Sequence, residues 1–193
     1  MSHQLTRLGS ALVLTTLLVG AAATEAIDAP VVVPATLRDV AGAPIDVASL
    51  ARTSRLVFVT VKAAWCPVCR TQLQRLGRLL PRLRACGTSF IVLAPGTDEE
   101  VAAIARETSF PYPFVADGAV ALAASAGFAT SPGELVPGFF AVDAERTVVW
   151  QQRGRGGGSF GDDELLRFLG CKAPADVLAL ARRERVVYAG GRW

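Results

Sequence analysis

The sequence predicts an α/β fold in which a mixed central sheet is flanked by helices and preceded by an amino-terminal β-hairpin. Residues 55–62 contain a run rich in β-branched side chains without clear alternation, as expected of a strand buried on both faces. Residues 67–85 repeat leucine at three- and four-residue steps, which is typical of a helix. Further strand and helix patterns alternate along the chain, and this order favours a layered sandwich.

Turn and cap residues bound these elements. The hairpin is predicted within residues 36–50, because a polar turn at 41–44 (Ala-Gly-Ala-Pro) separates two short apolar stretches. Pro67 fits the first turn of the long helix, where a missing N–H group costs little, and Gly87 marks its end. The other predicted elements are strands at 90–93, 111–115, 138–142 and 147–152, and helices at 98–107, 120–126 and 163–169.

Composition limits the chemistry that the chain can perform. Its 193 residues are 51% hydrophobic and 19% charged, which suits one folded domain with a buried core. The net charge of +3 is too small and too scattered to indicate nucleic-acid binding. The single histidine, His3, lies in a segment that we expect to be removed, which disfavours a His-dependent triad or metal site. Four cysteines therefore carry most of the possible chemistry.

Residues 1–26 have the pattern of an export signal. Arg7 precedes an almost uncharged stretch at 8–23, and small residues at 21–26 offer cleavage sites. The stretch is shorter than the roughly 20 residues that span a bilayer. We therefore expect cleavage and a periplasmic protein, with an uncleaved membrane anchor as the alternative. The rest of the chain is predicted to comprise an extended linker at 27–35, a folded domain at 36–170 and a tail with a short helix at 171–193.

Two cysteines lie where the buried strand gives way to the long helix, in the segment 65–69 (Trp-Cys-Pro-Val-Cys). Cys66 is expected at the helix N-terminus, where unpaired N–H groups and the helix dipole favour a thiolate. Cys69 lies one turn further in and is expected to be more protected. We predict that Cys66 attacks a partner disulfide and that Cys69 resolves the mixed disulfide. A structural disulfide and half of a metal site are the alternatives; no metal is predicted, because the other two cysteines are isolated.

These motifs resemble the redoxin branch of the thioredoxin fold. That branch contains alkyl-hydroperoxide-reductase-like proteins and exported thioredoxin-like proteins of cytochrome c maturation. The resemblance rests on residues 36–39, 56–59, 65–69 and 136–143 and covers roughly residues 35–170. It implies a thioredoxin-like three-layer sandwich for the 36–170 domain, and a redox-active disulfide that needs no other cofactor.

The resemblance also implies a substrate site beside the cysteines. It places Pro137 in the cis form facing the two sulfurs; an ordinary trans proline is the alternative, and Pro132 is a weaker candidate. Val136 would then offer its main-chain N–H and C=O groups to an extended partner peptide. Trp65 and Pro67 are the other expected substrate contacts.

Three positions depart from the family pattern, and a nearby lysine has two possible roles. Thr60 stands where many thioredoxin-like proteins have a buried acid, and Gln72 where cytochrome-maturation relatives often have Glu. No obvious carboxylate therefore accepts the proton of the resolving cysteine. Lys62 either stabilises the attacking thiolate or is a solvated charge. Ala63 occupies the position at which the peroxidatic pattern requires Thr.

The remaining cysteines, Cys86 and Cys171, are expected to meet at the distal edge of the sheet. In the implied fold the helices at 67–85 and 163–169 both run away from the active site on the same face. We predict a structural Cys86–Cys171 disulfide, which contributes roughly 4 kcal/mol by loop closure. Two free thiols, or Cys86 as the resolving cysteine of a peroxidase, are the alternatives.

The expected function is an exported thiol–disulfide oxidoreductase that exchanges disulfides with partner proteins, more as a reductase than as an oxidant. It would receive electrons from an upstream thiol donor and contact a membrane only if residues 1–26 were retained. A peroxiredoxin-like peroxidase using Cys66 and a non-catalytic binding or assembly module are the alternatives. The Gly-rich stretch 153–161 is expected to be a flexible connection, because no strand–loop–helix unit of phosphate-binding spacing surrounds it.

Overall fold

The computed structural model describes residues 30–116, 120–131, 133–154 and 162–171. The predictions of a cleaved signal and of Pro132 as a cis candidate lie outside these residues, as do all but two residues of the predicted flexible stretch 153–161 and all but Cys171 of the predicted tail 171–193. Arg153 ends a strand and does not belong to a flexible connection. Among the described helices, none combines the length and apolar character that a transmembrane span requires.

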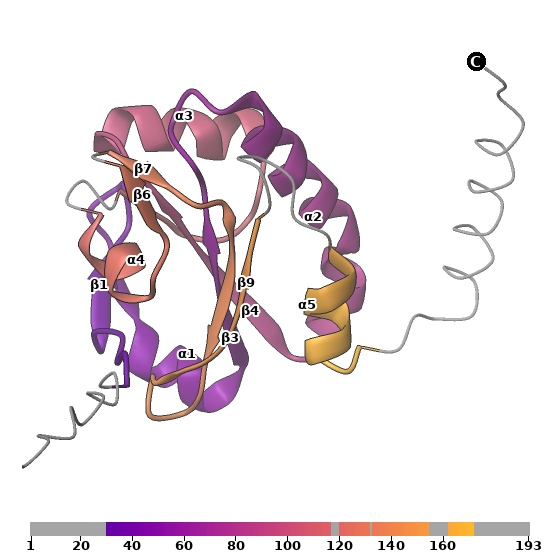
Figure 1. Ribbon diagram of the computed structural model, residues 1–193. Coiled ribbons are helices and arrows are strands. Elements are labelled where there is room, and N and C mark those ends of the chain that lie inside the picture. The colour runs from indigo at the N-terminus through magenta and orange to yellow at the C-terminus, as the bar shows by residue number, and fades with distance from the viewer. Residues whose placement is uncertain (1–29, 117–119, 132, 155–161, 172–193) are drawn as a thin grey trace, which may run out of the picture.

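A five-stranded mixed sheet forms the centre of the structure (Figure 1). Its first three strands are parallel, and each of the last two is antiparallel to the strand before it in the sheet. This arrangement confirms the predicted α/β fold with a mixed central sheet. The strand order is β5 (Phe114–Ala116), β4 (Thr88–Ala94), β3 (Arg55–Thr60), β8 (Gly138–Val142) and β9 (Val148–Arg153).

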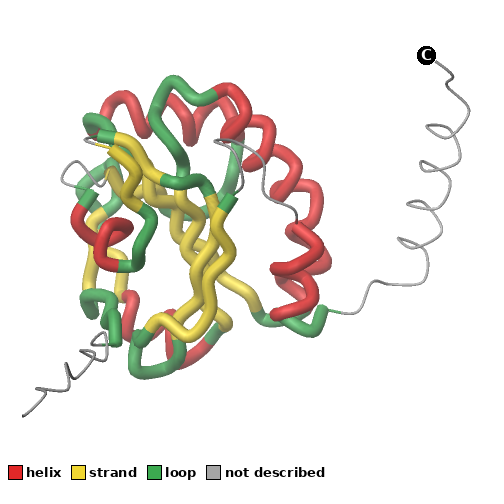
Figure 2. Tube along the Cα trace, viewed as in Figure 1, coloured by secondary structure: helices red, strands yellow, loops and turns green. Residues whose placement is uncertain are grey.

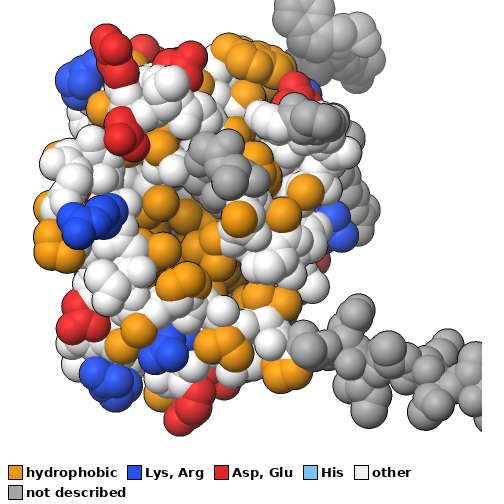
Figure 3. Space-filling view, turned by 90° about the vertical axis from the view of Figure 1, so that its left-hand side faces the viewer, with side chains coloured by type: hydrophobic (Ala, Val, Ile, Leu, Met, Phe, Trp, Pro, Cys, Tyr) orange, Lys and Arg blue, Asp and Glu red, His pale blue; other side chains and the backbone are white. Residues whose placement is uncertain are grey.

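Helices cover both faces of this sheet, so the molecule has three layers (Figure 2). Successive residues of β3 point to opposite faces: Val57 packs in one apolar cluster and Phe58 in the other. The first cluster includes α2 (Pro67–Ala85), α3 (Asp98–Thr108) and α5 (Asp162–Phe168), and the second includes α1 (Val47–Thr53) and α4 (Ala121–Ser125). On the side of the molecule where α4 and β1 lie, apolar side chains line a central hollow and charged side chains surround it (Figure 3).

Two small antiparallel pairs lie outside the central sheet. The first, β1 (Thr36–Arg38) with β2 (Pro44–Asp46), is the predicted amino-terminal hairpin. The second, β6 (Ala129–Ser131) with β7 (Glu134–Leu135), lies where only a loop was expected. Helix α1 was also not expected, although Asp46 caps it by accepting a hydrogen bond from the Ser49 N–H group.

The segment 30–35 is extended as predicted, but it does not behave as a linker. Val33 is fully buried, and Val32 forms an antiparallel bridge with Thr147. The N–H group of Val148 donates to the carbonyl of Val31 over 2.9 Å. Apolar burial and backbone pairing therefore make this segment part of the domain.

The distal ends of α2 and α5 are joined by the second pair of cysteines. Cys86 caps α2, Cys171 follows α5, and the structure has a disulfide between them, with Cα atoms 5.8 Å apart. Arg82 also donates to the Cys171 carbonyl, and Arg55 at the start of β3 donates to the Leu169 carbonyl. These contacts hold α5 beside α2, as Figure 1 shows.

Gly138, the first residue of β8, packs too closely against its neighbours to carry a side chain. A Cβ atom at this position would overlap the Gln152 carbonyl oxygen and lie 2.9 Å from the Phe128 ring. We expect Gly138→Ala to lower the free energy of unfolding by about 1–3 kcal/mol, the usual cost of overpacking. Urea denaturation measures this change.

The matched control is Gly77→Ala within α2, where a Cβ atom would meet nothing within 4 Å. Alanine favours the helix over glycine by about 1 kcal/mol, so this variant should be more stable than the wild type. A Gly138→Ala variant as stable as Gly77→Ala would contradict the close packing at β8.

Candidate redox site

The candidate site lies where the chain leaves β3 and enters α2. Cys66 is the N-cap residue of α2, and its Sγ atom accepts a hydrogen bond from the Cys69 N–H group over 3.2 Å. Pro67 follows as the first helical residue and has no N–H group to satisfy. A sulfur in this position is stabilised as a thiolate once the protein is reduced, because helix N–H groups and the dipole favour negative charge there.

The two cysteines of the site form a disulfide in the structure, with Cα atoms 5.4 Å apart. Cys66 and Cys69 are both buried. The main-chain N–H group of Lys62 donates to the Cys69 Sγ atom over 3.4 Å. Each sulfur therefore accepts a backbone N–H group, and the structure shows the pair in its oxidised state.

The surface around the buried disulfide is apolar and exposed. Trp65, Pro67 and Val68 are all exposed, although they adjoin the two buried sulfurs in sequence. One hollow of about 490 Å³ lies between Trp65 and the start of α3. A second hollow of about 360 Å³ lies between Lys62 and Pro137. Two hollows, one of them lined by Trp65, thus lie at this end of the sheet.

The structure corrects the expectation for Val136 and Pro137. Both lie at the same end of the sheet as the cysteines, since the Thr60 hydroxyl donates to the Val136 carbonyl over 2.7 Å. No peptide bond of the described residues is cis, so Pro137 is trans, the intrinsically favoured form. The Val136 N–H group donates to the Phe128 carbonyl over 2.6 Å. The β6–β7 hairpin thus occupies the N–H group that was expected to bind a partner peptide.

Lys62 contacts two other side chains of the site. Its Nζ atom lies 3.5 Å from a carboxylate oxygen of Glu134 and 5.0 Å from the centre of the Trp65 ring. The ammonium group is therefore paired with an acid and an aromatic face, and its effect on the Cys66 thiolate stays a prediction.

Sequence reasoning missed an acid close to the resolving cysteine. Gln72 is buried one turn after Cys69, and its Nε2 atom donates to Asp162 Oδ1 over 3.0 Å. Asp162 begins α5 and is buried as well. In the sequence this residue only precedes the predicted helix at 163–169, and no local pattern shows its burial, which depends on how α5 packs on α2. A buried carboxylate thus lies beside Gln72, one of the two positions where relatives often carry an acid and this chain does not.

Two further observations bear on the chemistry. Ala63, at the position of the peroxidatic threonine, is buried and carries no hydroxyl group. In the part of the chain that the structure describes, no three His, Cys, Asp or Glu side chains gather closely enough to hold a metal ion.

The model of the AhpC/TSA family matches residues 28–151. The chain belongs to the AhpC/TSA family. This confirms the resemblance to redoxins and makes the chain a thiol-dependent redox protein. A comparison with proteins of curated function finds no match.

Solved structures similar to this redoxin carry two kinds of description. A peroxidoxin, BcpB from Mycobacterium tuberculosis, has a TM-score of 0.62 and 20% identity and covers 72% of this chain and 93% of its own. Peroxiredoxin Q from Xanthomonas campestris also has a TM-score of 0.62 and 20% identity, with 76% and 99% covered. A secreted Mycobacterium tuberculosis disulfide oxidoreductase homologous to Escherichia coli DsbE has a TM-score of 0.55 and 18% identity, with 71% and 95% covered. These likenesses confirm the thioredoxin-like fold.

The N-cap position predicts a reactive Cys66 in the reduced protein. The Cys69→Ser variant leaves Cys66 as the single thiol of the pair, with the helix N-terminus still stabilising its thiolate. We expect iodoacetamide to alkylate Cys66 at neutral pH about tenfold faster than it alkylates the thiol of glutathione. An ordinary free thiol is only a few per cent ionised at neutral pH, and the thiolate is the form that reacts. Mass spectrometry of the alkylated peptides gives the rate.

The Cys66→Ser variant is the matched control, since it leaves only Cys69, which lies inside the first turn of α2 and not at its N-cap. That thiol should react more slowly than glutathione. Equal alkylation rates for the two variants would contradict the different roles assigned to the two sulfurs.

Proposed function

We propose that this redoxin is an exported thiol–disulfide oxidoreductase that reduces disulfides of partner proteins. The observation that carries the proposal is the local Cys66–Cys69 disulfide at the start of α2, bordered by exposed apolar side chains. A resolving sulfur already within bonding reach of the attacking sulfur suits disulfide exchange.

The reaction starts from the reduced pair. The Cys66 thiolate attacks a partner disulfide, a bond forms between Cys66 and one partner sulfur, and the other partner sulfur leaves as a thiolate. Cys69 then loses its proton and attacks the Cys66 Sγ atom, which releases the second partner thiolate and restores the Cys66–Cys69 disulfide. Two electrons pass to the partner, and an upstream thiol donor returns the pair to the reduced state. The redox-active disulfide serves without any other cofactor.

Partner contact involves Trp65, Pro67, Val136 and Pro137, which border the sulfurs or line the neighbouring hollows. Because the Val136 N–H group is already bonded to Phe128, contact there is made by side chains and not by a free main-chain donor. The exposed Trp65 ring supplies the largest apolar surface at this position.

Thiol peroxidase activity through Cys66 is the second candidate. The similar structures described as peroxidoxin and peroxiredoxin Q favour it. The absence of a hydroxyl group at Ala63 argues against it, because the peroxidatic pattern uses that hydroxyl beside the attacking sulfur.

Reduction of insulin disulfides tests the proposed activity. With dithiothreitol as the donor, the full chain should reduce insulin faster than dithiothreitol alone. Cys66→Ser removes the attacking sulfur, so its rate should fall to that of dithiothreitol alone. Cys69→Ser retains attack but not resolution, so the reduced variant, mixed with insulin after dithiothreitol has been removed, should form a covalent complex on non-reducing gels.

Two outcomes would contradict the proposal. Equal insulin reduction by the wild type and Cys66→Ser would leave a non-catalytic binding or assembly module as the better description. Hydrogen-peroxide turnover that is lost in Cys66→Ser, combined with no insulin reduction by the wild type, would indicate a peroxidase; Cys69→Ser should then still undergo the first oxidation.

Export is proposed from the pattern of residues 1–26. Expression of the full sequence in a Gram-negative host should yield a periplasmic chain whose first residue follows Ala23 or Ala26, as amino-terminal sequencing would show. An uncleaved chain in the membrane fraction would indicate an anchor, and an uncleaved cytoplasmic chain would contradict export.

A further inference from the structure

Three basic side chains near the redox disulfide each pair with an acid: Lys62 with Glu134, Arg70 with Glu107, and Arg75 with Asp162. The three acids differ in exposure. The side chains of Glu134 and Glu107 are 32% and 53% exposed, whereas that of Asp162 is 10% exposed. Water screens an exposed charge far more than a buried one, so Asp162 is the acid whose charge acts most strongly on its surroundings.

Asp162 is linked through Gln72 to the helix that carries the redox pair. Gln72 follows Cys69 by one helical turn and therefore shares its face of α2. The Gln72 amide donates to Asp162 Oδ1 over 3.0 Å, which joins the carboxylate to the face of α2 that also carries the resolving cysteine. The Arg75 Nε atom lies 2.7 Å from the other carboxylate oxygen, but the Arg75 side chain is 44% exposed. Solvent thus weakens the positive partner more than the negative one.

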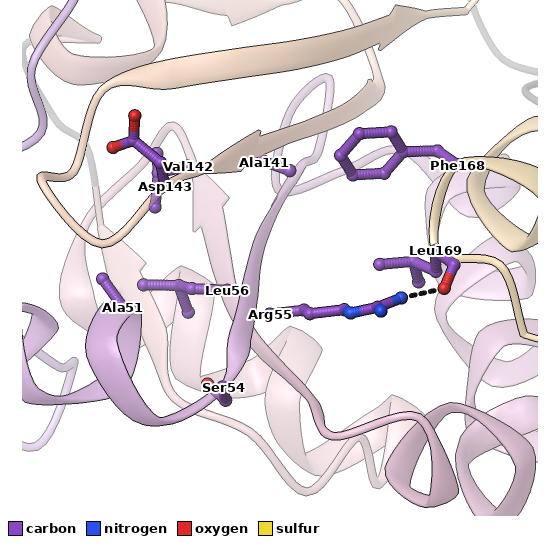
Figure 4. A pocket seen from close by; sticks show the side chains of 9 residues that line it. All are labelled: Ala51, Ser54, Arg55, Leu56, Ala141, Val142, Asp143, Phe168 and Leu169. Atoms are coloured by element: carbon purple, nitrogen blue, oxygen red, sulfur yellow. Dashed lines mark hydrogen bonds between the residues drawn. The ribbon is translucent and has the colours of Figure 1, made fainter.

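The opposite end of α5 keeps Asp162 in this position. Figure 4 shows the Arg55 side chain reaching from the start of β3 to the Leu169 carbonyl, beside a pocket of about 320 Å³. Two residues further on, Cys171 is bonded to Cys86 at the end of α2. A seven-residue helix is marginal on its own, so these anchors fix where its first carboxylate lies.

We propose that Asp162 sets the reduction potential of the Cys66–Cys69 couple and makes the reduced protein a stronger reductant. The inference deepens the proposed function. Reduction takes up two electrons and one proton and converts the disulfide into the Cys66 thiolate and the Cys69 thiol. A buried negative charge nearby disfavours the new thiolate and so favours the oxidised form, whereas Arg75 acts in the opposite sense.

Equilibration with reduced and oxidised glutathione, followed by alkylation and mass spectrometry of the Cys66–Cys69 peptide, measures the equilibrium constant for reduction. Asp162→Asn keeps an oxygen that accepts from Gln72 but removes the charge. It should increase this constant about tenfold, equivalent to a potential about 30 mV more oxidising for a two-electron couple. Arg75→Gln should decrease the constant, by a smaller factor because that side chain is more exposed.

The opposite signs distinguish a charge effect from a structural one. Loosening the contact between α5 and α2 would move both variants in the same direction, whereas removal of opposite charges moves them apart. The double variant should return towards the wild-type constant, and Asp162→Glu should retain it. Asp163→Asn, on the exposed neighbour in the same helical turn, is the matched control and should leave the constant unchanged.

Shifts of the same sign in Asp162→Asn and Arg75→Gln, or an Asp162→Asn constant equal to that of Asp163→Asn, would overturn the inference. Should Asp162→Asn fail to fold, Arg75→Gln alone decides. An unchanged or increased equilibrium constant for reduction in Arg75→Gln would contradict the proposed electrostatic effect of this ion pair on the redox couple. The glutathione equilibrium does not require insulin turnover. A wild type that fails to reduce insulin therefore refutes the proposed function, while unchanged constants in the variants refute only the role of Asp162.

Discussion

The hydrogen bond between the Cys69 N–H group and the Cys66 Sγ atom is the interaction on which the site depends. In most helices a side-chain oxygen of the N-cap residue accepts this hydrogen bond, whereas here a sulfur accepts it. The same sulfur atom therefore caps α2 and carries the chemistry. The position is fixed from the other side by β3, whose pairing with β4 and β8 continues to Thr60. The resolving sulfur then meets the first one because it lies in the first turn of the same helix.

The fold by itself does not distinguish disulfide exchange from peroxide reduction, since structures described in both ways share it. The groups that touch the sulfurs carry the difference. Here those groups are main-chain N–H donors from Lys62 and Cys69, while Ala63 contributes no hydroxyl. The sulfurs thus accept main-chain N–H groups and have no hydroxyl at position 63, an arrangement that supports the proposed disulfide exchange without deciding it by the fold.

Long elements with a regular local pattern of apolar residues could be predicted from the sequence. Helix α2 was predicted over its whole length, through Pro81, because its apolar face and its flanking Pro67 and Gly87 agree. Short elements were missed: α1 has only seven residues, and β6 and β7 exist through pairing with each other. The same hairpin explains the error at Val136, because no local pattern shows that Phe128 will take its N–H group. The family resemblance gave the location of that segment but not its bonding.

The position of Asp162 follows from the same difference between local and tertiary information. Both family positions for an acid on β3 and α2 are uncharged here, as Thr60 and Gln72. A carboxylate on α5 reaches Gln72 only if α5 is held against α2, and the Cys86–Cys171 disulfide is the covalent part of that hold. An acid carried by β3 or α2 would be fixed by the sheet or by the active-site helix itself. An acid carried by a short helix is held in place only by the contacts of that helix with the rest of the domain. In this redoxin the Cys86–Cys171 disulfide is one of those contacts, so it helps to position the charge of Asp162 relative to the redox pair as well as stabilising the fold.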